Sequence, residues 1–133
     1  MKSWIKEYSV GVKELDDQHI KMLEYINEVE AALYAEDSRQ TIVRVLNGLV
    51  RYTKDHFATE ETYFKLYDYE NTEAHILEHL DLISSVEKLV YELEIGGDLN
   101  PDKMLSFLEA WLFDHIMSAD REYMSCFESN GHS

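Results

Sequence analysis

Seven side chains of metal-binding types recur along this chain at spacings that a helix can use. Residues four apart on an α-helix point the same way, because they lie about 40° apart around the axis and about 6 Å apart along it. Two pairs have that spacing, a third pair is five residues apart, and a single histidine precedes them all. The seven are His19, His56 with Glu60, His75 with His79, and His115 with Asp120.

The spacing of His115 and Asp120 does not suit a regular helix. At about 3.6 residues per turn, residues five apart point roughly 140° away from each other. Both side chains can reach one site only if the helix overwinds, bulges or ends between them. The sequence therefore predicts an irregular turn between Ile116 and Asp120.

Length and composition predict a single domain over residues 1–133. The net charge of −15, from 12 basic against 27 acidic residues, argues against nucleic acid or an anionic membrane as partner, because both would be repelled. Cys126 has no second cysteine to pair with, the first residues lack a secretion signal, and no segment approaches the roughly 20 apolar residues of a membrane span. We therefore expect a cytoplasmic protein.

Apolar residues recur with helical periodicity from about residue 16 onward, so we expect an all-α fold. An irregular N-terminal arm would occupy residues 1–15, the bundle about 16–118, and a tail with a short C-terminal helix about 119–133. Gly96 and Gly97 would end the third helix, and Asn100 and Pro101 would begin the fourth. Long helices joined by short loops favour an up-down-up-down antiparallel four-helix bundle. The four helices are expected over about 16–37, 39–66, 72–95 and 101–118.

This topology would bring the seven side chains together. They lie near the start of the first helix, the end of the second, the start of the third and the end of the fourth. In an antiparallel bundle these four positions share one end. Each group alone has an ordinary explanation, such as a solvent-facing histidine or a hydrogen-bonded pair on one helix. A core holding all of them without metal would be severely destabilised.

A rival motif overlaps the same residues. The segment His75-Ile76-Leu77-Glu78-His79 fits the H-x-x-E-H pattern of one class of zinc peptidase. Such short patterns arise by chance on helices, and a peptidase would leave the other five candidate residues without a role. We therefore interpret Glu78 as a solvent-facing helix residue.

The donor set indicates which metal the site would take. Seven nitrogen and oxygen donors without a thiolate exceed the needs of one tetrahedral zinc and suit two first-row ions, most naturally iron. Oxygenase-type di-iron bundles use about four carboxylates and two Glu-x-x-His motifs, and this chain has no Glu-x-x-His. A site rich in neutral imidazole carries less negative charge and disfavours high-valent, substrate-oxidising states. Reversible dioxygen binding is the more natural use.

The stretches that hold these residues resemble those of the bacterial hemerythrins over nearly the whole chain. They are Trp4, Val10-Gly11-Val12, Leu15 to His19, His56 to Glu61, His75-x-x-x-His79 and Trp111-Leu112-x-x-His115-Ile116-x-x-x-Asp120. The resemblance implies two non-haem iron ions, Fe²⁺ or Fe³⁺, one with an open position for dioxygen. The implied ligands are His75, His79 and His115 for one iron and His19 and His56 for the other, with Glu60, Asp120 and an oxo or hydroxo group as bridges.

Apolar residues near the candidate ligands would line the dioxygen pocket. Leu112 is the strongest candidate, since it lies one turn before His115 on the same face. Gln18, Asp17 or Tyr123 would orient ligand imidazoles, and the sequence does not choose among them. The expected pocket residues are Leu112, Ile116, Phe57, Leu23 and Met22.

Three functional interpretations stay open at this stage. The first is a dioxygen carrier or store, which is a binding protein and not an enzyme. The second is a di-iron oxidase, peroxidase or nitric-oxide-consuming enzyme. The third is an oxygen or iron sensor that works through a separate, unidentified protein partner. We favour the carrier, and we expect a monomer because the net charge is strongly negative and no extra apolar face is evident.

Overall fold

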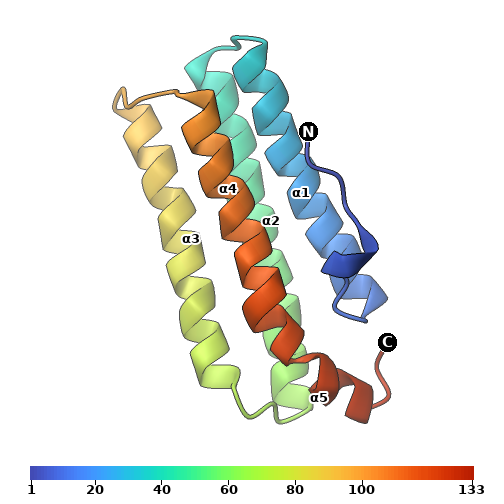
Figure 1. The fold of residues 1–133 in the computed structure, drawn as a ribbon. Coiled ribbons are helices and arrows are strands. Elements are labelled where there is room, and N and C mark those ends of the chain that lie inside the picture. Colours follow the sequence, from blue (N-terminus) through green and yellow to red (C-terminus); the bar gives the residue numbers. More distant parts are fainter.

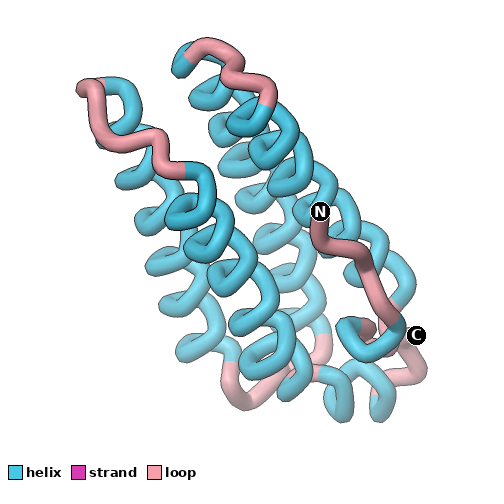
Figure 2. Tube along the Cα trace, turned by 45° about the horizontal axis from the view of Figure 1, so that its top comes forward, coloured by secondary structure: helices cyan, strands magenta, loops and turns pink.

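A computed structural model describes all residues 1–133 and confirms an antiparallel bundle of four long helices with no strand. In Figure 1 the helices run up and down in turn, with the start of α1, the end of α2, the start of α3 and the end of α4 at the lower end. Figure 2 places the loops at the two ends of the bundle and in the N-terminal arm. The helices are α1 (Lys13–Tyr34), α2 (Arg39–Leu66), α3 (Thr72–Glu94), α4 (Pro101–His115) and the short α5 (Met124–Ser129).

Capping residues set several of these bounds, and those at Gly96, Asn100 and Pro101 were predicted. The Asn100 side chain accepts a hydrogen bond from the Lys103 N–H at 3.0 Å, and Pro101 occupies the first turn of α4. At the start of α2, the Ser38 side chain accepts from the Thr41 N–H at 3.2 Å. After α3, Gly96 takes a φ of 97°, which a residue with a Cβ rarely adopts. These local signals are readable without knowing the fold.

The predicted start of the first helix, at Asp16 or Asp17, was wrong by about one turn. The helix begins at Lys13, and Val12 precedes it without a side-chain cap. The carboxylate of Asp16 binds the arm instead, accepting from the Ser9 hydroxyl at 2.5 Å and from the Val10 N–H at 2.8 Å. Asp16 therefore ties the arm to α1 and does not cap the helix. The same helix also ends earlier than predicted, at Tyr34.

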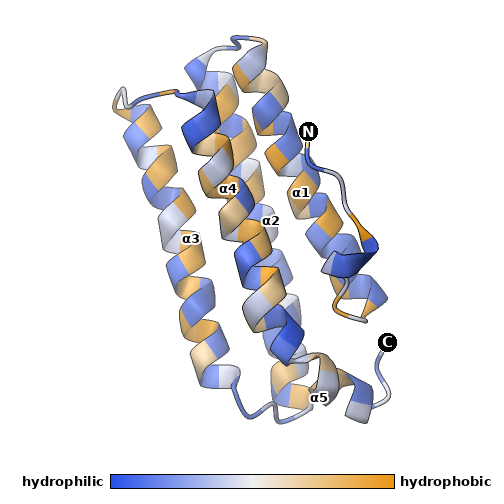
Figure 3. Cartoon of the chain, in the orientation of Figure 1, coloured by the Kyte–Doolittle hydropathy of each residue, from blue (hydrophilic) through white to orange (hydrophobic).

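The core fills the space between the helices, and polar residues cover the outside (Figure 3). One departure from this pattern lies on α3 and at the residue after it, where four large apolar side chains are 56–66% exposed. They form two separate pairs, because the exposed Ser84 and Lys88 lie between them on the same helix face. No helix is both long and apolar enough to cross a membrane. These four exposed residues are Leu77, Leu80 and Tyr91 of α3 and Ile95 directly after it.

The predicted irregular turn is confirmed as a π-helical segment, Ile116–Asp120, which continues α4. A π-turn holds one residue more than an α-turn, so it changes the direction in which later side chains point. Ile116, Ala119 and Asp120 are buried, whereas Met117 and Ser118 face solvent. The segment therefore turns Asp120 inward, toward the side of the bundle that His115 faces.

Inserting one alanine after Ser118 should place Asp120 six residues after His115 and rotate its side chain by about 100°, out of the core. We expect the insertion variant to lose most of its bound metal, measured as metal per chain after reconstitution. Deleting Ser118 is the matched control, because it leaves an interval of four residues, which a regular helix directs to one face, so the deletion variant should keep most of its metal. Full metal binding by the insertion variant would show that the length of this segment does not position Asp120.

Candidate metal centre

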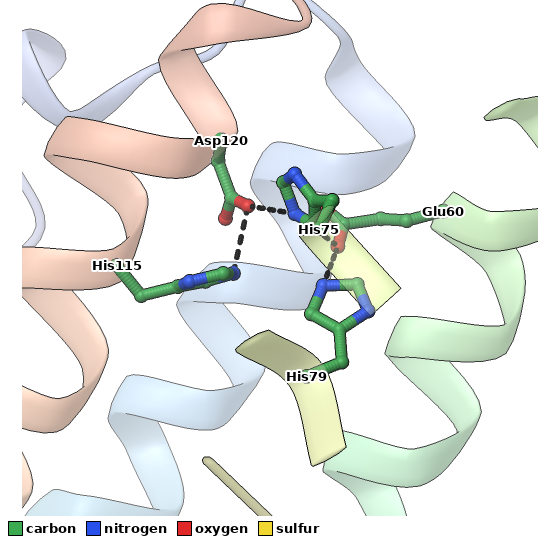
Figure 4. Close-up of side chains that lie close together, drawn as sticks. All are labelled: Glu60, His75, His79, His115 and Asp120. Atoms are coloured by element: carbon green, nitrogen blue, oxygen red, sulfur yellow. Dashed lines mark hydrogen bonds and ion pairs between the residues drawn. The ribbon is translucent and has the colours of Figure 1, made fainter. Parts of the chain in front are cut away.

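The structure brings all seven predicted side chains together at one end of the bundle, and each is 5% exposed or less. Their nitrogen and oxygen atoms form two groups, within each of which the atoms lie within 4.8 Å of one another. Glu60 and Asp120 belong to both groups. The larger group contains Glu60, His75, His79, His115 and Asp120 (Figure 4), and the smaller contains His19, His56, Glu60 and Asp120.

The Asp120 carboxylate faces both groups with different oxygens. Its Oδ1 lies 3.0 Å from His75 Nε2 and 2.9 Å from His115 Nε2, as the dashed lines of Figure 4 show. Its Oδ2 lies 3.1 Å from His19 Nε2. One carboxylate thus spans the two groups, as a bridging ligand would.

Glu60 repeats this arrangement from α2. Its Oε1 lies 3.0 Å from His79 Nε2, in the larger group, and its Oε2 lies 3.5 Å from His56 Nε2, in the smaller. Tyr123 donates a hydrogen bond to the same Oε2 at 2.7 Å. Burial, with the nearby charges of Glu60 and Asp120, raises the pKa of Tyr123 well above its ordinary value, so its hydroxyl stays protonated.

Most of these inward-facing atoms have no hydrogen-bond partner although they lie close together. The unpartnered atoms are Nε2 of His19, His56, His79 and His115, Glu60 Oε1 and Asp120 Oδ2. Buried polar atoms without partners are costly, and native proteins contain few of them. Two ligands about 2.1 Å from one metal ion and at right angles lie roughly 3 Å apart. The separations of 2.9–3.1 Å therefore fit atoms that converge on metal ions.

Three of the imidazoles are held from outside through Nδ1. His56 Nδ1 lies 2.5 Å from Gln18 Oε1, His79 Nδ1 lies 2.8 Å from Glu61 Oε2, and His115 Nδ1 lies 2.9 Å from Glu78 Oε1. With Nδ1–H donating to these oxygens, Nε2 of His56 and of His79 presents a lone pair to the centre, and Nε2 of His115 would do so once it has lost its proton. The outer oxygens thus fix the tautomer that a metal ligand needs.

The sequence anticipated only part of this outer shell. Gln18 was among the candidates, but Asp17 pairs with Lys13 at 2.7 Å instead. Tyr123 binds a carboxylate and not an imidazole. Glu78 faces solvent as predicted, with a side chain that is 43% exposed, but its contact with His115 Nδ1 was not anticipated. Glu61 was missed, and its one signal is its place directly after Glu60.

Burial and neighbouring charges set the protonation of the site. Burial lowers the pKa of His56 and of His79 to about 4, so both are neutral near pH 7. Burial alone would lower the pKa of His115, but Asp120 and Glu78 raise it to about 9. Although burial would raise the pKa of Asp120, His115, His19 and His75 hold it well below its ordinary value. Metal ions would have to displace the proton on His115.

A small cavity of about 10 Å³ lies beside the smaller group, with room for roughly one water-sized molecule. Its polar wall is made by His19, His56, His115 and Asp120. Four of the five predicted pocket residues line it, but Leu23 does not, and Leu82 and Trp111 were not predicted. The apolar wall consists of Met22, Phe57, Leu82, Trp111, Leu112 and Ile116.

Comparisons with known proteins agree on one family. The family model described as the hemerythrin HHE cation binding domain matches residues 10–127. Bacteriohemerythrin of Clostridium acetobutylicum is 31% identical over 125 residues, which cover 91% of this chain and 97% of that protein. Bacteriohemerythrin of Pseudomonas aeruginosa is 31% identical over 121 residues, covering 91% and 78%. A crystal structure of wild-type hemerythrin superposes with a TM-score of 0.85 at 27% identity, covering 95% of this chain and 97% of that one.

Glu78→Gln should weaken metal binding about tenfold, because the neutral amide is a poorer acceptor for the His115 Nδ1–H. The measurement is a competition titration against a chelator of known affinity. Glu73→Gln is the matched control, since Glu73 lies exposed in the first turn of the same helix. Equal affinities for the two variants would show that Glu78 does not support His115.

Acidification should destabilise the metal-free protein through His56 and His79. Between pH 6.5 and about 4 the unfolded chain binds protons at these residues that the folded chain excludes, so the free energy of unfolding falls as pH falls. Urea denaturation at several pH values measures this slope. The double variant His56→Asn, His79→Asn should show a shallower slope, and an unchanged slope would contradict the lowered pKa values.

Proposed function

Because this chain belongs to the hemerythrin family, whose members bind dioxygen on a di-iron fold, we propose that it binds dioxygen reversibly as a carrier or store. We assign His75, His79 and His115 to one iron, His19 and His56 to the other, and Glu60 and Asp120 to both as bridges. The observation that carries this assignment is the orientation of the two carboxylates. In each of them, one oxygen faces the larger group and the other oxygen faces the smaller group.

The two groups differ in how many positions the protein fills. The larger group offers three imidazoles beside the shared carboxylates, and the smaller offers two. The small cavity adjoins the smaller group, through His19 and His56. An iron held there would have fewer protein ligands and room beside it for dioxygen, and it would supply the electrons that reversible dioxygen binding requires.

The residues around the cavity favour storage over oxidation chemistry. Apart from the assigned ligands, the wall is apolar, and its one polar group, the Trp111 Nε1–H, donates to the Leu82 carbonyl oxygen at 2.9 Å. Outside the assigned ligands, the wall therefore offers no free O–H or N–H to protonate a bound molecule. Outside the cavity, Tyr123 directs its hydroxyl to Glu60. The chain thus excludes water and withholds protons, which preserves dioxygen for release.

The proposal is tested by loading the protein with iron, reducing it without air, and recording visible spectra as air is admitted and removed. We expect about two irons per chain, as the donor set implies, and a charge-transfer band that appears and disappears over repeated cycles. Irreversible oxidation with the same iron content would point to an oxidase. A single bound zinc would overturn the proposal.

Leu112→Ala should speed spontaneous oxidation of the dioxygen-loaded protein by about three- to tenfold, because it opens the dry wall of the cavity to water. The decay of the visible band measures this rate. Leu108→Ala is the matched control, since Leu108 is fully buried one turn earlier in α4 but does not line the cavity. Equal decay rates for the two variants would show that lost packing, and not the wall, controls oxidation.

A further inference from the structure

The cavity beside the smaller group has a volume of about 10 Å³, which holds roughly one water-sized molecule. Dioxygen is larger, so a part of the wall must yield when it enters. Two surface grooves share wall residues with it. One runs between α3 and α4 and the other between α2 and α3.

The groove between α3 and α4 has the closer relation to the cavity. Its volume is about 440 Å³, and Leu82, Trp111 and His115 line both it and the cavity. Because His115 is an assigned iron ligand, Leu82 and Trp111 are the two shared residues whose side chains can move without disturbing a ligand. Leu82 is half-buried and Trp111 is 8% exposed. These two side chains form a thin wall between solvent and the cavity.

The groove between α2 and α3 is closed more firmly. It shares only Phe57 with the cavity. The Phe57 ring stacks on the ring of His79 with centroids 3.6 Å apart and planes 3° apart. His79 is itself held by Glu61 at 2.8 Å. Movement of Phe57 would therefore disturb an assigned ligand, which makes this route costly.

Helix packing also favours entry between α3 and α4. The helix pairs α1–α2, α2–α3 and α1–α4 pack closely, whereas α3 and α4 form the loosest neighbouring pair. Figures 1 and 2 both show these two helices side by side. One hydrogen bond joins α4 to α3 beside the cavity, from the Trp111 Nε1–H to the Leu82 carbonyl oxygen at 2.9 Å. A carbonyl oxygen has two lone pairs, so it can accept this bond beside its helical one.

We propose that Trp111 and Leu82 form a gate through which dioxygen enters and leaves between α3 and α4, with the Trp111–Leu82 hydrogen bond as its latch. This proposal rests on the proposed dioxygen function. Breaking the bond lets the indole ring swing out into the groove and joins groove and cavity without moving a ligand. Because a gate changes the barrier and not the bound state, it sets both rates and leaves the equilibrium affinity unchanged.

The test measures dioxygen association and dissociation rates by stopped flow on the reduced, iron-loaded protein. Trp111→Phe removes the donor and keeps an aromatic ring, and it should raise both rates about three- to tenfold. Leu82→Ala thins the gate and should act in the same direction. In both variants we expect the equilibrium dissociation constant to stay within about twofold of the parent value.

Ile83→Ala is the matched control. Ile83 is the next residue of α3, is also half-buried, and lines only the groove between α2 and α3. Its rates should equal those of the parent protein. Faster rates in Ile83→Ala alone would place entry between α2 and α3 and overturn the gate. Unchanged rates in Trp111→Phe and Leu82→Ala, with reversible binding intact, would also overturn it.

A second measurement needs no dioxygen and separates failure of the gate from failure of the proposed function. Hydrogen exchange of the Trp111 indole N–H, followed by NMR and distinguished from Trp4 with a Trp4→Phe variant, reports how often the latch opens. Leu82→Ala should speed this exchange, and Ile83→Ala should not. Equal exchange in the two variants would overturn the gate. Absence of reversible dioxygen binding in the parent protein would contradict the function alone.

Discussion

The burial of five imidazoles and two carboxylates at one end of a four-helix bundle is the constraint on which the rest of the structure depends. Polar groups removed from water cost free energy unless other partners replace the lost hydration. Here most of the atoms that point to the centre have no hydrogen-bond partner. Metal ions are partners that can satisfy all of them at once, so metal binding and folding are linked in this protein.

The bundle meets this constraint in layers. The antiparallel topology brings the four helix ends that carry the candidate ligands to one level, and the π-helical segment turns Asp120 toward His115. Around these side chains, Gln18, Glu61 and Glu78 hold three of the imidazoles from outside. Apolar residues then form much of the wall of a small cavity beside the group with fewer donors. Each layer would restrict the chemistry of a bound metal further, from the donors that bind it, to their orientation, to the molecules that reach it.

Much of this could be predicted from local sequence signals. Ligand spacing, helical periodicity and caps such as Asn100 act within one helix, so they are visible without the fold. The five-residue interval from His115 to Asp120 predicted an irregular turn, which the structure shows as a π-helical segment, because regular helix geometry cannot direct both side chains to one site. The identity of the seven donors came from the same intervals.

What the sequence could not supply depends on contacts between distant residues. Asp16 looks like a helix cap, but its carboxylate binds Ser9 and Val10 of the N-terminal arm. These contacts form only when the arm packs against α1 in the folded chain. Glu61 and Glu78 resemble other surface carboxylates until α2, α3 and α4 pack together. The apolar stripe of each helix contains more residues than the cavity uses, so periodicity selected Leu23 and missed Leu82 and Trp111.

Anomalous diffraction at the iron absorption edge, from crystals of the iron-loaded protein, tests the central claim most directly. The account predicts two iron peaks, both bonded to Glu60 and Asp120. One should also be bonded to His75, His79 and His115, and the other to His19 and His56, with its vacant side toward the cavity. A single peak, or a pair without a shared carboxylate, would contradict it.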